Sequence, residues 1–429
     1  MPDADLHNIE TYLIALCIGG WLLALVYIQL RRSRPGFQIT GPLIVGVAVR
    51  LSLSLFVAVT GLGASLRGGD EPGFIDAAQH LGATTPWLHA ITSDLYVAVF
   101  GVQLKLFNAS LESLRVTQVF ITVIGLALLA AAVYDLTDQR RARIAAWLLA
   151  LEPASAFFSS LLHKEPLMYL AVGLAIYGAA RVWRRLDTAG LALMIGGCLV
   201  GVATRDYAGF FLLAGCALVL SHASILHLGR GQARSIPLLV LVIGALGLGA
   251  VEAVRVTQPG SPVLNRLRAS QSFNSVDPNS HLGLEPVDFS NRTSILESLP
   301  VRIRDVLLRP YPWQVRNLSQ QLGLLGTVVA LLTFFLLLRV LWWARGSILQ
   351  RAGPIIYPSL LTLIAYALTT GNAGTGFRYR TNMIGPALAL LVVLWRVRAT
   401  AGLSDEGPAR AAGARSRIGA PRMAAGYPW

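Results

Sequence analysis

Charged side chains are scarce in this 429-residue chain. Asp, Glu, Lys and Arg together make up 14% of the residues, whereas 54% are hydrophobic. Soluble proteins carry charges on about a quarter of their residues. The composition therefore excludes an ordinary water-soluble globule and predicts a protein that is solvated mainly by lipid.

Lysine and cysteine are also rare. Lys105 and Lys164 are the only lysines, so arginine supplies almost all of the positive charge. The three cysteines, Cys17, Cys198 and Cys216, all fall inside apolar runs. This placement indicates packing as small apolar side chains and excludes a disulfide framework.

Long apolar runs dominate what remains. About eleven of them approach the length needed to cross a bilayer. They predict an all-α, polytopic membrane domain over residues 1–398, with a retained first span. The predicted spans are 11–30, 41–62, 116–134, 142–162, 166–180, 190–203, 208–226, 235–254, 321–342, 354–370 and 382–395.

Arginines mark every second connection between these runs. Because basic loops stay in the cytoplasm, the N-terminus is expected outside and the basic tail, 399–429, inside, where it is predicted to be disordered. Topology and attraction to anionic lipid then explain most of the net charge of +14, and no nucleic-acid partner is expected. The expected location is the inner (plasma) membrane of a bacterium.

Under this topology five segments face outward. Two are long loops, 63–115 and 255–320, and three are turns around 163–165, 205–207 and 371–381. Long loops without a use are uncommon, so the outer side is where a functional site is expected.

The first outer loop contains adjacent acids, Asp70 and Glu71, after two glycines. A carboxylate beside the membrane and beside a second carboxylate can act as a general base, because both effects raise its pKa. The alternative is a solvated acidic turn that caps a helix starting near Phe74. Residues 87–107 are expected to form an amphipathic helix at the interface.

The first two short turns concentrate ionisable groups. His163, Lys164 and Glu165 follow one another at membrane depth, where charges are costly and therefore indicate function. Lys164 is suited to bind a phosphate, with Glu165 holding it in place. The alternative is a turn solvated by lipid headgroups. Arg205 repeats the pattern beside Asp206, where a plain surface ion pair is equally acceptable.

The third turn combines glycines with arginines. Arg378, Tyr379 and Arg380 follow the glycine-rich segment 371–376. Glycines allow close approach of a ligand, and two guanidinium forks around a tyrosine suit a phosphate or diphosphate. Anchoring arginines belong on the inner side, so their outward position favours a binding role.

These motifs together resemble the GT-C superfamily of membrane glycosyltransferases. Asp70 and Glu71 correspond to the catalytic position of that superfamily, the segment His163 to Pro166 to its next recurrent element, and the turn ending at Arg380 to the end of many bacterial members. The resemblance implies a polyprenyl-phosphate-linked sugar donor, a glycan or lipid-linked acceptor, and an extracytoplasmic active site used in envelope glycan assembly. Phe74 stands where members often have a tyrosine, which leaves open which acid is catalytic.

Three alternatives remain open from the sequence. Polysaccharide polymerases and ligases share the broad architecture, a lipid or solute transporter would place charges near the midplane, and a scaffold protein would need no converging charged turns. A divalent cation, Mg²⁺ or Mn²⁺, is compatible with the carboxylates, but no set of His and acidic residues has the spacing of a metal site.

Overall fold

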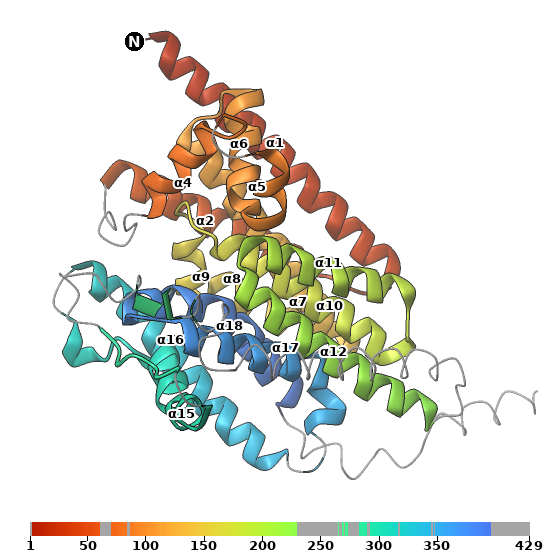
Figure 1. Cartoon of the computed structure of the whole chain (residues 1–429). Coiled ribbons are helices and arrows are strands. Elements are labelled where there is room, and N and C mark those ends of the chain that lie inside the picture. Colours follow the sequence, from red (N-terminus) through yellow and green to blue (C-terminus); the bar gives the residue numbers. More distant parts are fainter. Residues whose placement is uncertain are drawn as a thin grey trace, which may run out of the picture.

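In a computed structural model of the chain, the described residues form a bundle of helices (Figure 1). The structure describes residues 2–60, 70–83, 86–229, 265, 268–269, 271–272, 283–289, 292–315, 318–344, 346 and 348–395. No β-strand is formed within these ranges, although an antiparallel bridge joins Gly283 and Asn372. The prediction of an all-α membrane protein is confirmed at this level.

The helices follow one another through short connections. The first half of the chain contains α1 (Pro2–Ser33), α2 (Thr40–Thr60), α4 (Asp70–Gln79), α5 (Trp87–Ser93), α6 (Leu95–Phe107), α7 (Leu111–Leu136), α8 (Gln139–Leu151), α9 (Pro153–Phe158), α10 (Glu165–Arg185), α11 (Thr188–Thr204) and α12 (Asp206–Leu228). The second half contains α15 (Arg292–Leu308), α16 (Leu318–Trp343), α17 (Ile348–Thr369) and α18 (Ala373–Leu394).

Seven helices are long and apolar enough to cross a membrane, namely α1, α2, α7, α10, α12, α16 and α17. Each coincides with a predicted span. The total of eleven stays a prediction, because α8 and α11 are shorter, with 13 and 17 residues, and because the predicted span 235–254 lies outside the described residues. The predicted tail, 399–429, also lies outside them.

The predicted span 142–162 is not one helix. It breaks at Glu152, whose backbone is extended (φ −62°, ψ 116°), because the proline ring of Pro153 disfavours the helical conformation in the residue before it. The Glu152 carboxylate then caps α9 by accepting hydrogen bonds from the backbone N–H groups of Ala154 at 2.9 Å and Ser155 at 2.5 Å.

The two long predicted loops, 63–115 and 255–320, contain helices. The helix predicted to start near Phe74 begins at Asp70, and the single interfacial helix predicted for 87–107 is divided into α5 and α6 at Asp94. The loop 255–320 includes α15. The helix bounds predicted in the first loop were wrong because helices stabilised by tertiary packing need no strong local signal.

Helices α7 and α10 form the middle of the bundle, between α1 on one side and α12 and α17 on the other (Figure 1). Most of their side chains are buried, whereas α1, α2 and α16 expose apolar side chains. The two central helices approach closely at Gly125 and Gly173, where a Cβ on Gly173 would lie 2.8 Å from the Gly125 carbonyl oxygen. Small residues at such crossings are typical of membrane helices.

The two ends of the bundle differ in charge. Arginines from three predicted inner connections meet at one end, where Arg34 and Arg184 both contact Asp135, at 2.5 Å and 3.5 Å, and Arg141 donates to the Val393 carbonyl at 3.3 Å. The positive-inside rule predicts that this arginine-rich end faces the cytoplasm. Helices α10, α12 and α18 begin at the opposite end, which is therefore the predicted outer end.

Candidate functional site

A buried carboxylate joins the starts of three helices at the predicted outer end. Glu165 is the first residue of α10 and is 2% exposed. Its Oε1 accepts hydrogen bonds from Nη2 of Arg205 at 2.7 Å and from Nε of Arg378 at 3.4 Å. A carboxylate is also favoured at this position by the positive end of the helix dipole. Three turns predicted to face outward therefore meet at one side chain.

This ion pair leaves polar atoms available. The Oε2 atom of Glu165 and the Nη1 atom of Arg205 have no hydrogen-bond partner among the described residues. A cavity of about 10 Å³, lined in part by Thr122, Ser159 and Tyr169, adjoins Glu165. That volume suits one water molecule. Buried donors and acceptors without partners are costly, so these atoms mark a place where a polar ligand or water gains affinity.

Aromatic rings hold Arg205 in place. Its guanidinium carbon lies 4.3 Å from the ring centroid of Tyr379, which stacks on Tyr366 and accepts a hydrogen bond from the Tyr207 hydroxyl at 3.0 Å. Burial alone would lower the pKa of Arg205, but the Glu165 carboxylate and these tyrosines raise it well above its ordinary value. Arg205 is thus a permanent buried cation, paired with Glu165 rather than forming a plain surface pair with Asp206.

Lys164 pairs with a carboxylate from another segment. Its ammonium lies 3.0 Å from Oδ1 of Asp94, at the break between α5 and α6, and 5.0 Å from the centroid of the Phe74 ring. Sequence analysis expected Glu165 to hold Lys164, but Glu165 is occupied by the two arginines. The Lys164 side chain remains 18% exposed, so its charge is accessible to a ligand.

The two candidate acids of the first loop lie in the first turn of α4. Glu71 is buried, and its Oε1 accepts a hydrogen bond from Nη2 of Arg115 on α7 at 3.1 Å. Arg115 also lies 3.6 Å from Glu112. The side chain of Asp70 lies outside the described part of the structure. Asp70 and Glu71 therefore lie at a helix N-terminus, which favours negative charge, and not in a turn. Gly68 and Gly69 lie outside the described residues.

Tyr96 on α6 connects these groups. Its ring packs 5.0 Å from Phe74 and 4.2 Å from Phe100, and its fully buried hydroxyl has no hydrogen-bond partner among the described residues. Burial raises the pKa of Tyr96 well above its ordinary value, and the charges of Glu165 and Glu71 raise it further. Both carboxylates therefore act on one hydroxyl. Sequence analysis missed Tyr96, because one tyrosine in an apolar helix carries no signal.

Seven side chains form what we call the ionic cluster: Glu71, Asp94, Arg115, Lys164, Glu165, Arg205 and Arg378. Glu112 lies at its edge, 3.6 Å from Arg115. Beside it, His163 is completely buried, with its ring 6.0 Å from that of Phe158. A turn solvated by lipid headgroups, the alternative considered from the sequence, does not describe His163 or Glu165.

The predicted glycine-rich turn around Arg378 is largely helical. Helix α18 begins at Ala373, capped by the Asn372 side chain, which accepts a hydrogen bond from the Thr375 N–H at 2.8 Å. Residues two positions apart on a helix point about 200° apart. Arg378 and Arg380 consequently diverge, and the predicted fork of both arginines around Tyr379 is not formed.

Arg380 is bound by the protein itself. It is completely buried and donates hydrogen bonds to the carbonyls of Leu307 at 2.9 Å and Arg309 at 3.2 Å, and to the Thr327 hydroxyl at 2.9 Å. These contacts tie α18 to the end of α15 and to α16. The geometry therefore gives Arg380 a positioning role, whereas Arg378 contributes to the ionic cluster.

A second buried cation lies in the middle of a predicted span. Arg50, in the middle of α2, donates to the carbonyl of Ala150 at 2.8 Å and to the Ser155 hydroxyl at 2.9 Å. It thereby holds the break at Glu152. Sequence analysis did not single out Arg50, although one arginine inside an apolar run is itself a signal.

The described residues contain no group of three His, Cys, Asp or Glu side chains that could hold a metal ion. Comparison with known proteins adds no assignment: no protein family, curated protein or solved structure matches this chain. Any proposal on function therefore depends on the chemistry of the ionic cluster and its surroundings.

Proposed function

We propose that this chain is a membrane glycosyltransferase that moves a sugar from a polyprenyl-phosphate or polyprenyl-diphosphate donor to an acceptor hydroxyl on the extracytoplasmic side. The observation that carries the proposal is the convergence of Glu165, Arg205 and Arg378 from three separate turns. A scaffold protein has no need of such an arrangement, because burying charges costs several kcal/mol, by order of magnitude, for each ion.

The reaction requires a base. In the proposed mechanism the carboxylate of Asp70 or Glu71 removes the proton of the acceptor hydroxyl. The hydroxyl oxygen then forms a bond to the anomeric carbon, while the bond between that carbon and the phosphate oxygen breaks. The electron pair stays on the lipid phosphate, which is the leaving group.

The leaving phosphate requires cations. Lys164 and Arg378 are assigned to it, since their side chains are 18% and 14% exposed, whereas those of Arg205 and Arg115 are 7% and 4% exposed. Arg205, held by Tyr379, fixes Glu165, and Glu165 orients Arg378. Fixed cations near developing negative charge lower the barrier, because they need no reorganisation during the reaction.

The test uses the purified full chain in lipid nanodiscs, with polyprenyl monophosphate as the probe and native mass spectrometry as the readout. We expect binding that weakens about tenfold in Arg378→Gln, because one charge-assisted contact is lost. The matched control is Arg181→Gln, whose guanidinium pairs with Asp187 at the arginine-rich end. Absence of binding to both polyprenyl monophosphate and diphosphate would contradict the proposal.

A polysaccharide polymerase or ligase would use the same cluster with a different acceptor. The product distinguishes the two. A transferase releases one polyprenyl phosphate or diphosphate for each single sugar added, whereas a polymerase or ligase moves a preassembled glycan chain. Mass analysis of the acceptor after incubation with defined lipid-linked donors separates these outcomes.

A transporter or lipid flippase is the second candidate, and one observation favours it. Arg50 and Glu152 lie at a broken helix within the bundle, an arrangement typical of transport sites. Proteoliposomes containing the purified chain test this candidate. Movement of a lipid-linked sugar between leaflets without glycosyl transfer would favour the transporter, and Glu152→Gln should then abolish that movement.

A further inference from the structure

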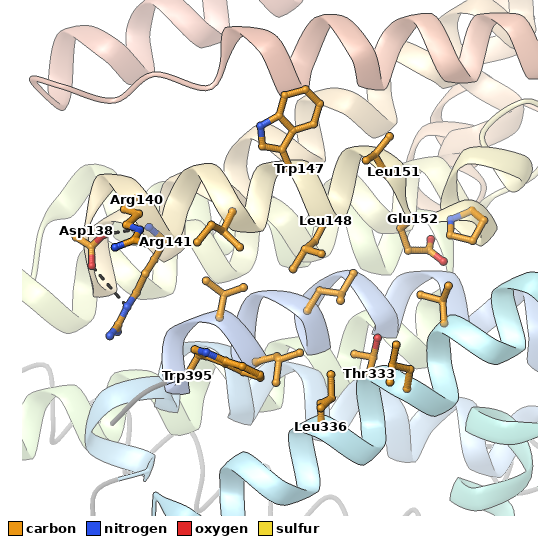
Figure 2. Close-up of a pocket in the computed structure, with 17 residues that line it drawn as sticks. Asp138, Arg140, Arg141, Trp147, Leu148, Leu151, Glu152, Thr333, Leu336 and Trp395 are labelled. Carbon is orange, nitrogen blue, oxygen red and sulfur yellow. Dashed lines mark hydrogen bonds and ion pairs between the residues drawn. The ribbon is translucent and has the colours of Figure 1, made fainter. Parts of the chain in front are cut away.

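A large groove is lined by none of the residues of the ionic cluster. Its volume is about 840 Å³, and it runs between α8, α16 and α18 (Figure 2). Its walls are mostly apolar and open to the side, with Leu332 58%, Leu151 54% and Ile144 45% exposed. Because α16 is long and apolar enough to cross a membrane, we expect the groove along it to open toward lipid.

The two ends of the groove differ in charge. Arg140 and Arg141 lie at one end beside Asp138, whereas the Glu152 carboxylate lies at the other (Figure 2). Arg141 is 3.6 Å from Asp138, but Arg140 is exposed and has no hydrogen-bond or ion-pair partner among the described residues. An anionic group is therefore attracted to the arginine end and repelled from the Glu152 end.

A polar hollow continues from the arginine end. It measures about 530 Å³ and shares Asp138 and Arg141 with the groove, and Arg184 and Arg351 also line it. Its acid Asp135 is already paired with Arg34 at 2.5 Å. The hollow therefore offers positively charged space next to the apolar groove, as an amphipathic ligand with an anionic head requires.

The length of the groove matches one membrane leaflet. The 13 residues of α8 extend about 20 Å, which is enough to cross the hydrocarbon of one leaflet, about 15 Å thick. We propose that the groove binds a phospholipid of the inner leaflet, with one acyl chain between α8, α16 and α18 and its anionic headgroup on Arg140 and Arg141. This inference does not depend on the proposed glycosyl transfer.

Native mass spectrometry of the purified full chain tests the site, with phosphatidylglycerol and phosphatidylcholine of identical acyl chains as probes. We expect the Arg140→Gln, Arg141→Gln double variant to lose about tenfold or more in affinity for phosphatidylglycerol, with little change for phosphatidylcholine. Arg140→Gln alone should lose about fivefold and, lacking internal contacts, should fold normally.

Two further variants separate the headgroup from the chain. Leu332→Trp fills the groove and should weaken both lipids alike. Arg143→Gln is the matched control, because Arg143 is exposed on the same helix but does not line the groove. It should leave both affinities unchanged.

Three results would overturn the assignment. The first is an unchanged preference for phosphatidylglycerol in the double variant. The second is an equal loss in Arg143→Gln, which would indicate attraction by general surface charge. The third is an affinity for polyprenyl phosphate that falls about tenfold in the Arg140→Gln, Arg141→Gln double variant while that for phosphatidylglycerol does not, since the occupant of the groove would then be the donor lipid and not a bulk phospholipid.

Discussion

Arg205 donates a hydrogen bond to Glu165 at 2.7 Å across 40 positions of the chain. Both side chains are less than 10% exposed. Removal of either partner of a buried ion pair leaves the other charge uncompensated, so this pair links the starts of α10 and α12 strongly.

The first prediction concerns this pair. Arg205→Gln should lower the free energy of unfolding by about 3 kcal/mol or more, because Glu165 keeps its charge with only the longer contact to Arg378. Thermal and denaturant unfolding in mixed micelles measure the change. The control is Asp76→Asn, which removes an exposed pair with His80 and should cost less than about 1 kcal/mol. Equal effects of the two changes would argue against tight burial of Glu165.

The second prediction separates Arg378 from Arg380. Arg380→Gln should mainly destabilise the protein, by about 3 kcal/mol, since two carbonyls and a hydroxyl lose a charged donor. Arg378→Gln should mainly weaken binding of the lipid phosphate, because Glu165 retains Arg205. Melting temperature and polyprenyl-phosphate affinity are measured for each. Normal phosphate affinity in Arg378→Gln, or a selective binding defect in stably folded Arg380→Gln, would reverse the assignment.

The third prediction concerns the base. Asp70→Asn should reduce glycosyl transfer about a hundredfold or more in a protein that still folds, as expected for a general base. Glu71→Gln should lower the melting temperature in addition to any loss of transfer, because buried Arg115 then loses its ion pair with Glu71. Initial rates of release of the lipid phosphate give the readout. If both variants keep nearly normal transfer, neither carboxylate is the base.

The fourth prediction tests helix packing with two neighbouring glycines of α11. A Cβ on Gly197 would lie 2.5 Å from the Ala175 nitrogen of α10, whereas a Cβ on Gly196 meets nothing within 4 Å. Gly197→Ala should therefore destabilise the protein by about 1–3 kcal/mol through forced separation of the helices. Gly196→Ala should be neutral or slightly stabilising, because alanine favours the helix. A similar melting temperature for both variants would contradict this crossing of α10 and α11.

The fifth prediction concerns orientation. In a cysteine-free background, Gly73→Cys should react with an impermeant reagent from outside, and Arg185→Cys only after permeabilisation, because Arg185 belongs to the arginine-rich end. A cysteine fits at Gly73, where a Cβ meets nothing within 4 Å. Labelling with the opposite sidedness would place the ionic cluster in the cytoplasm and remove the basis of the proposed function.

Local sequence alone determined the membrane class and the approximate position of most helices. Long apolar runs are unfavourable in water, and a run of about 20 residues has the length of a helix that crosses a bilayer. The arginines in every second connection are also visible in the sequence alone. The contacts of Arg34 and Arg184 with Asp135 show that two of these connections lie at the same end. One predicted span, 142–162, is divided at Pro153, whereas Pro354 and Pro358 lie inside the continuous helix α17.

Tertiary structure alone decided the partners of the charged residues. From the sequence, Glu165 was assigned to its neighbour Lys164, and Arg378 was joined with Arg380, because adjacent residues are the only ones whose proximity a sequence guarantees. In the folded chain Glu165 binds Arg205 and Arg378, Lys164 binds Asp94, and Arg380 binds backbone carbonyls. Successive side chains of a helix point in different directions, so neighbours in the sequence do not face the same partner. A buried charge is stable only when it is paired, and helix packing decides which opposite charge lies near it.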